Sequence, residues 1–216
     1  MLDLQDAMNQ RVNPEWQLAG YAWHRAIYVE STELLNHLGN WAWWKKLPAD
    51  IPQAQMELVD IFHFGISLLM VSSGMTERVD LARQLAAQLE QAVQTHVERG
   101  LLNEEEVNEL VDNLVGWGAS GIFNVEAFGG LLHNLGMTPL SLYKGYIGKN
   151  ALNRFRQNHG YKTGTYHKTW HGEEDNVHLE RILDNLVVTE AGLFDRVYNA
   201  LEGVYATVLA GADISG

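Results

Sequence analysis

The stretch "MELVDIFHFGISLLMV", residues 56–71, contains the longest apolar run of the chain. The run is too short for a typical membrane span and is interrupted by Asp60 and His63, so it predicts a buried helix of a protein core. Glu57 and Asp60 are three residues apart, which places their carboxylates on nearly the same face of that helix. Two acids on an otherwise apolar helix are the first candidate functional residues.

A second acid pair with the same spacing lies in "YVESTELL", residues 28–35, where Glu30 and Glu33 share one helical face. If both helices turn these faces inward, four carboxylates converge, and their mutual repulsion is relieved either by protonation or by cations. Oxygen ligands favour a hard cation such as Mg²⁺. A solvated helix face is the better interpretation of one such pair, but two pairs on consecutive helices make it less convincing. An iron site, with His63 three residues after Asp60, stays possible but incomplete.

The composition bounds the remaining possibilities. The chain has 216 residues, of which 46% are hydrophobic and 19% are charged, as in a globular protein with a sizeable core. It has no cysteine, which excludes disulfides and thiolate metal sites and agrees with a cytoplasmic protein. With 15 basic and 27 acidic residues, the net charge is −12, so nucleic acid is not an expected partner. The first ten residues do not resemble a signal peptide, and we expect no membrane association.

The rest of the chain shows mainly the 3.6-residue period of helices, so we predict an all-α fold. Asn103 with Glu106 predicts a capping box, Thr138 before Pro139 predicts a helix start, and Gly160 predicts a helix end. Residues 160–172 are expected to be an irregular functional loop. The expected helices cover about 2–11, 17–38, 53–72, 76–98, 103–115, 124–135, 139–158, 174–187 and 189–209.

A basic and aromatic segment, residues 146–176, contains a third of the lysines and arginines of this acidic chain. Lys149, Asn153 and either Arg156 or Gln157 share one helical face by their spacing of three and four. A charge run is usually a solvated face, but the mixture with Asn, Gln and Tyr favours oriented hydrogen bonds to a ligand. Arginine and lysine bind phosphate. A carboxylate–metal half together with a cationic half therefore suits a polyphosphate substrate.

Five stretches together resemble one known family: "LQDAMN" (4–9), "ExxE" (30–33), "WAWWK" (41–45), "ELVDIFHF" (57–64) and "GKNALNRFRQNHGYKTGTYHKTWHGEEDN" (148–176). They are similar to the dimeric, all-α dUTPases, which are related to MazG-type nucleotide pyrophosphatases. The resemblance implies one domain over residues 1–216: a MazG-like helical bundle with an additional helical subdomain, in a homodimer. Residues 73–137 carry no family motif and are a candidate mobile helical insertion.

The resemblance also implies a Mg²⁺-dependent hydrolase that converts dUTP, and also dUDP, to dUMP, with two or more ions per site. Glu30, Glu33, Glu57 and Asp60 would be the metal ligands, and Glu30 or Glu33 would orient or deprotonate the attacking water. The amides of the first helix would read the uracil. The full set of implied substrate contacts is Gln5, Asn9, Trp43, His63, Lys149, Asn153, Arg156, Tyr161, Lys168 and Asn176.

Three positions depart from the family pattern. Val29 stands where some members have a second acid, Ala42 where lysine is frequent, and Phe62 where tryptophan is usual. Two other functions stay open from the sequence. One is the same chemistry on another nucleotide such as dCTP, because a flip of an amide at Gln5 or Asn9 exchanges donor and acceptor. The other is a non-catalytic nucleotide-binding regulator.

Overall fold

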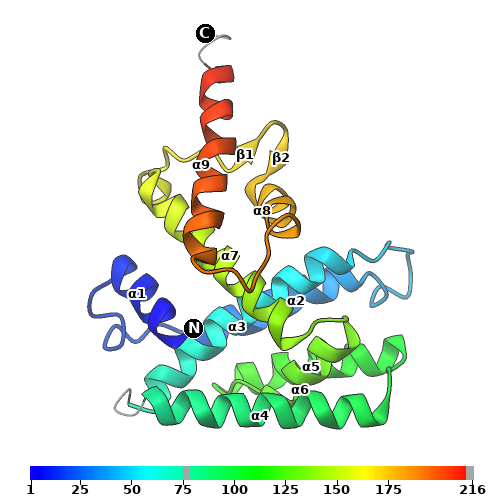
Figure 1. Cartoon of the computed structure of the whole chain (residues 1–216). Helices are drawn as coiled ribbons and strands as arrows, with labels where there is room; N and C mark the ends of the chain where they lie inside the picture. The colour runs from blue at the N-terminus through cyan, green and yellow to red at the C-terminus, as the bar shows by residue number, and fades with distance from the viewer. Residues whose placement is uncertain (75–77, 213–216) are drawn as a thin grey trace. The chain divides into compact units, whose positions relative to one another are not determined.

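The computed structural model describes residues 1–74 and 78–212, and it confirms the all-α prediction (Figure 1). It divides into two compact units: an N-terminal unit, residues 2–142, and a C-terminal unit, residues 143–216 with Met1. The helices are α1 (Leu2–Val12), α2 (Trp23–Leu38), α3 (Ile51–Ser72), α4 (Arg78–Arg99), α5 (Glu104–Ala119), α6 (Val125–Asn134), α7 (Pro139–Asn158), α8 (Asp175–Asp184) and α9 (Leu193–Ala212). A 3₁₀ turn (Tyr161–Thr163) and a hairpin of β1 (Thr169–Trp170) and β2 (Glu173–Glu174) follow α7.

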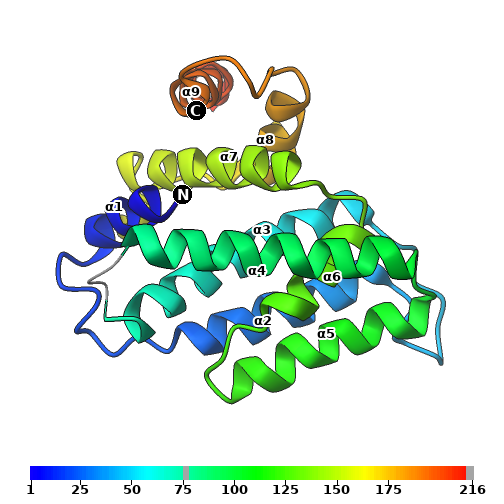
Figure 2. The ribbon, with the colours of Figure 1, turned by 60° about the horizontal axis from the view of Figure 1, so that its bottom comes forward.

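The apolar helix α3 forms the centre of the N-terminal unit. It packs against α1, α2 and α6, while α5 packs against α2 and α6, and α4 packs against α6 (Figure 2). Leu58, Ile61 and Ile66 of α3 and Ile27 and Leu34 of α2 are completely buried. Burial of each such side chain stabilises the fold by about 1.5–3 kcal/mol. The helix is long and apolar enough to cross a membrane, but 61% of its most apolar window is buried inside the protein, as in a core helix.

Several predicted helix ends are confirmed. Asn103 accepts a hydrogen bond from the backbone N–H of Glu106, and the Glu106 side chain accepts one from the backbone N–H of Asn103. Thr138 and Ser141 make the equivalent reciprocal pair at the start of α7. Gly160, just after α7, has a φ of +88°. Each of these residues satisfies or redirects backbone groups that a helix end leaves without partners.

Other predicted bounds are wrong for identifiable reasons. The helix predicted from residue 17 begins only at Trp23, because Trp16 is buried and donates its indole N–H to Asp6, which holds the preceding segment as turns. Helix α5 continues to Ala119 instead of ending near residue 115, since Gly118 is buried beside Ile27 of α2. The first residues of the helix predicted over 76–98 lie outside the described residues.

In the C-terminal unit, α9 begins at Leu193, four residues later than predicted. Arg196 explains the delay, because its guanidinium donates to the backbone carbonyls of Val187 and Glu190 and holds that segment as a loop. The predicted irregular loop, residues 160–172, contains the 3₁₀ turn and β1, and β1 pairs with β2 just beyond it, with Thr169 opposite Glu174 and Trp170 opposite Glu173. Two positive-φ residues, His171 and Gly172, form the tight turn between these strands.

Candidate functional site

Helices α2 and α3 bring three of the predicted acids together in the N-terminal unit. Glu30, Glu33 and Glu57 each offer a carboxylate oxygen, and these oxygens lie within 4.8 Å of one another. Glu33 is exposed, Glu30 is half-buried and Glu57 is buried. We call these three residues the acid cluster. It combines a solvent-accessible edge with a buried floor.

The electrostatics of Glu30 show the cost of this arrangement. Burial, the charge of Asp60 and a hydrogen bond with Glu57 together raise the pKa of the Glu30 carboxyl from 4.5 to about 8. Asp60 therefore acts electrostatically on the acid cluster from the next turn of α3. Without a cation, the protein relieves the repulsion by keeping a proton on Glu30 at neutral pH.

The donor set of the acid cluster fits a hard divalent cation. All its ligand atoms are carboxylate oxygens, two on α2 and one on α3, which is how helix bundles build carboxylate metal sites. A cation held by Glu30, Glu33 and Glu57, with Asp60 close by, would replace the proton on Glu30 and compensate the negative charge. Both the convergence of the three carboxylates and the raised pKa of Glu30 therefore favour a cation at this position.

His37 lies beside the acid cluster, although the sequence did not single it out. Its Nε2 is 3.6 Å from Oε1 of Glu57. Its backbone carbonyl accepts a hydrogen bond of 2.7 Å from the N–H of Asp50, the residue that caps α3. The sequence feature that could have indicated His37 is its position four residues after Glu33, which puts both side chains on one face of α2.

A buried polar network connects α1 with α3 in the same unit. Gln5 and Asn9, the predicted uracil-reading amides, are hydrogen-bonded to each other, with Nε2 of Gln5 3.0 Å from Oδ1 of Asn9. Oε1 of Gln5 is 2.6 Å from Nδ1 of His63, and Nδ2 of Asn9 is 3.1 Å from Oγ of Ser67. All four side chains are buried, with exposures of 6% or less. The predicted residues Gln5, Asn9 and His63 thus form one group, and Ser67 is the member that sequence reasoning missed.

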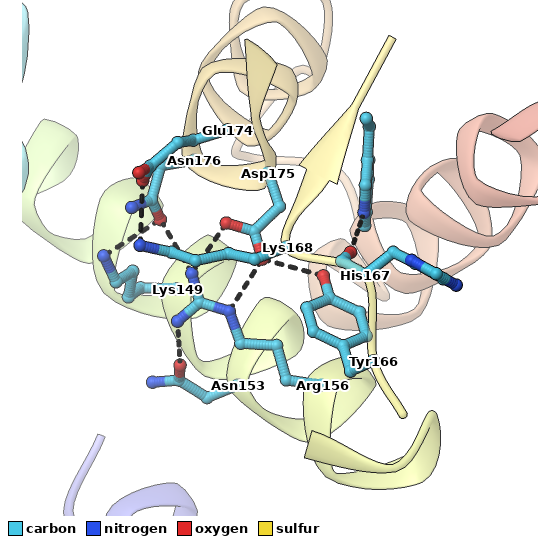
Figure 3. A network of polar contacts seen from close by, with 10 residues as sticks. Lys149, Asn153, Arg156, Tyr166, His167, Lys168, Glu174, Asp175 and Asn176 are labelled. Carbon is cyan, nitrogen blue, oxygen red and sulfur yellow. Dashed lines mark hydrogen bonds and ion pairs between the residues drawn. The ribbon is translucent and has the colours of Figure 1, made fainter. Parts of the chain in front are cut away.

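Arg156 and Asp175 form the centre of the polar network of the C-terminal unit (Figure 3). Nε and one terminal nitrogen of Arg156 each lie 2.8 Å from a different carboxylate oxygen of Asp175. Tyr166 donates to the same carboxylate at 2.7 Å. Burial disfavours the charge of Asp175, but the hydrogen bonds from Arg156 outweigh it and hold the pKa of this carboxyl below its usual range. Asp175, which was not predicted, therefore anchors a predicted phosphate contact.

Around that pair lie four of the other predicted contacts, Lys149, Asn153, Lys168 and Asn176 (Figure 3). Lys149 is buried and donates to Oδ1 of Asn176 at 3.1 Å, and Asn153 accepts from Arg156 at 3.2 Å. The exposed Lys168 pairs with Glu174 at 2.9 Å. The ring of Tyr161 is half-exposed and lies under the Arg156 guanidinium, 5.9 Å from its centroid. The structure thus brings all six predicted residues of this unit into one neighbourhood, with Arg156 at its centre.

Two further features belong to the N-terminal unit. The side chain of Trp43 is 89% exposed and contacts Trp44 edge-on, while its neighbour Ala42 is buried. A cavity of about 590 Å³ is lined by α4 and by the segment from Trp117 to Glu126. None of the predicted site residues lines this cavity.

Comparison with known proteins assigns the chain to a family. A family model described as dUTPase matches residues 1–161, and no curated protein gives a significant match. The matched part contains the acid cluster and the amide network, whereas Lys168 and Asn176 lie beyond it. The match covers well over half of the chain, and the observed fold is all-α. The chain therefore belongs to the all-α dUTPase family, and it is an enzyme of the dUTP diphosphatase class.

Proposed function

We propose that the protein hydrolyses dUTP, and also dUDP, to dUMP in a Mg²⁺-dependent reaction with water as the nucleophile. The observation that carries this proposal is the acid cluster, in which Glu30, Glu33 and Glu57 converge and the pKa of Glu30 is raised to about 8. Such a cluster has the chemistry of a cation site. Membership in the dUTPase family indicates that the substrate is dUTP.

The four acids have two roles in this proposal, metal binding and proton transfer. Glu30, Glu33, Glu57 and Asp60 would hold the cations, two or more per site, and Mg²⁺ bound there would supply positive charge to phosphate oxygens and to water. Water adds across the linkage between the α- and β-phosphates of dUTP, which yields dUMP and pyrophosphate, and a carboxylate takes the proton that the attacking water loses. Glu33 is the most exposed acid of the cluster and is the better placed for that proton, with Glu30 as the second candidate.

The substrate is held through its base and its phosphates. Gln5 and Asn9 contact the uracil, His63 contacts the nucleoside, and Trp43 walls the base or sugar. By resemblance to the family, Lys149, Asn153, Arg156, Tyr161 and Lys168 are nucleotide and phosphate contacts, and Asn176 acts close to the metals or phosphates. Two N–H groups of Arg156 are hydrogen-bonded to Asp175. This fixes the position of the arginine, which in turn holds the neighbouring donor side chains in place. The protein acts as a homodimer in the cytoplasm.

Product analysis tests this proposal. The purified protein is incubated with dUTP, dUDP, dCTP and the ribonucleotide UTP, with Mg²⁺ or with EDTA, and the products are separated by ion-exchange chromatography. We expect dUMP and pyrophosphate from dUTP, and no turnover in EDTA. Equal or faster turnover of dCTP would replace the substrate assignment, and release of orthophosphate instead of pyrophosphate from dUTP would contradict the mechanism.

A further inference from the structure

A serine without any predicted role determines how the buried amides are oriented. Ser67 of α3 is completely buried, and its hydroxyl donates to the backbone carbonyl of His63 at 2.8 Å. A hydroxyl has only one proton, so toward Asn9 the Ser67 oxygen acts as an acceptor. The atom of Asn9 that lies 3.1 Å from this oxygen must therefore be its NH₂ nitrogen.

This one direction determines all the others in the network. With its nitrogen on Ser67, Asn9 turns its carbonyl oxygen toward Gln5, which must then present its own NH₂ at 3.0 Å. The carbonyl oxygen of Gln5 consequently faces Nδ1 of His63, which must carry the ring proton to donate across 2.6 Å. Each amide is thus held in one of its two orientations by the group before it.

Orientation matters because it is what distinguishes uracil from cytosine. Uracil donates from its ring N3–H and accepts at O4, whereas cytosine accepts at N3 and donates from its amino group. An amide with one orientation therefore suits one base and leaves buried polar groups mismatched with the other, a difference worth orders of magnitude in selectivity. A freely flipping amide suits both bases.

We infer that Ser67 is a positioning residue for base selection: through its hydrogen bonds to His63 and Asn9 it holds the amides of Asn9 and Gln5 in the orientation that accepts deoxyuridine nucleotides and rejects deoxycytidine nucleotides. This inference rests on the proposed function, in which these amides contact the base. It adds a residue that lies behind the amides and controls specificity through them.

The kinetic test compares Ser67→Ala with a matched control. Ser31 is also completely buried and donates to the carbonyl four residues earlier, at 2.7 Å, so Ser31→Ala removes the same kind of bond outside the amide network. We expect the ratio of kcat/KM for dUTP to that for dCTP to fall at least tenfold in Ser67→Ala, to recover in Ser67→Thr, and to stay unchanged in Ser31→Ala. An unchanged ratio in a folded Ser67→Ala protein would overturn the inference.

An NMR measurement tests the same direction without turnover. Long-range ¹H–¹⁵N spectra of the wild-type protein report which ring nitrogen of His63 carries the proton, and we expect Nδ1–H with Nε2 unprotonated. The Nε2–H tautomer would reverse the whole network and overturn the inference, even if dUTP is hydrolysed. A wild-type protein with the expected tautomer that turns over no dUTP would instead count against the proposed function.

Discussion

At the scale of single residues, Glu30 shows most clearly what the acid cluster does to the protein. Its pKa of about 8 arises from burial first, then from the charge of Asp60 and the hydrogen bond with Glu57. A carboxyl whose pKa is higher in the folded than in the unfolded state stabilises the fold only while it is protonated. That contribution is complete below about pH 4.5 and is lost as the pH rises toward 8.

The corresponding prediction concerns Glu30→Gln. In EDTA, the free energy of unfolding of the wild-type protein should fall between pH 5 and about 8, and Glu30→Gln should show a smaller fall because its side chain cannot ionise. Urea unfolding followed by circular dichroism at each pH measures this difference. Glu109→Gln, which removes an exposed acid on α5, is the control and should retain the wild-type slope. Parallel profiles for the wild-type protein and Glu30→Gln would contradict the account.

The spacing of residues predicted the acid pairs, because helical periodicity alone places Glu30 beside Glu33 and Glu57 beside Asp60. The roles of Ser67 and Asp175 were not predictable in this way. Ser67 depends on the packing of α1 against α3, and Asp175 depends on the return of the chain beside α7 after the hairpin. Serines and aspartates occur at many helix positions, so only the tertiary structure indicates which of them anchors another side chain.

At the scale of elements, the buried pair of Arg156 and Asp175 joins α7 to the start of α8 and orders the loop between them. The Asp175 side chain is completely buried and that of Arg156 is 12% exposed. The C-terminal unit also contains an exposed counterpart, in which Arg181 makes two hydrogen bonds to Glu173 with side-chain exposures of 57% and 44%. The two pairs have the same chemistry and differ in burial.

This contrast gives a matched prediction. Asp175→Asn leaves a buried guanidinium charge without its counter-ion and should lower the free energy of unfolding by about 3–5 kcal/mol. Glu173→Gln breaks a solvent-screened pair and should cost less than about 1 kcal/mol. Urea unfolding followed by tryptophan fluorescence measures both, since Trp170 is buried in this unit. Similar costs for the two variants would show that Asp175 does not anchor the loop.

The elements themselves were predictable where local chemistry decides them. The capping box at Asn103 and the start of α7 at Thr138 follow from two or three neighbouring residues. The start of α2 and the hairpin near Trp170 were not predictable, because the first depends on the distant Asp6 and the second on a turn at His171, a non-glycine residue with a φ of +50°. Local patterns predict helices well and their tertiary interruptions poorly.

At the scale of the whole molecule, an acidic protein has to bind an anionic substrate. With a net charge of −12, the chain as a whole repels a nucleoside triphosphate, so binding has to depend on local positive charge. Cations in the acid cluster and the lysines and arginine around Asp175 are the two sources that we propose. The family match supports the overall activity, and the acid cluster is the part on which that activity should depend.

Hydrolysis of dUTP should depend on the acid cluster, and Glu57→Gln is the decisive variant. Glu57 is the buried acid of the cluster, and its replacement keeps the size of the side chain while it removes a charged ligand. Measured as dUMP formed from dUTP with saturating Mg²⁺, the rate should fall by at least about a hundredfold, because losing a ligand should cost at least as much as losing an outer-shell partner of a ligand. Glu126→Gln, an acid outside the cluster, should keep the wild-type rate. A Glu57→Gln protein with wild-type activity would contradict the account.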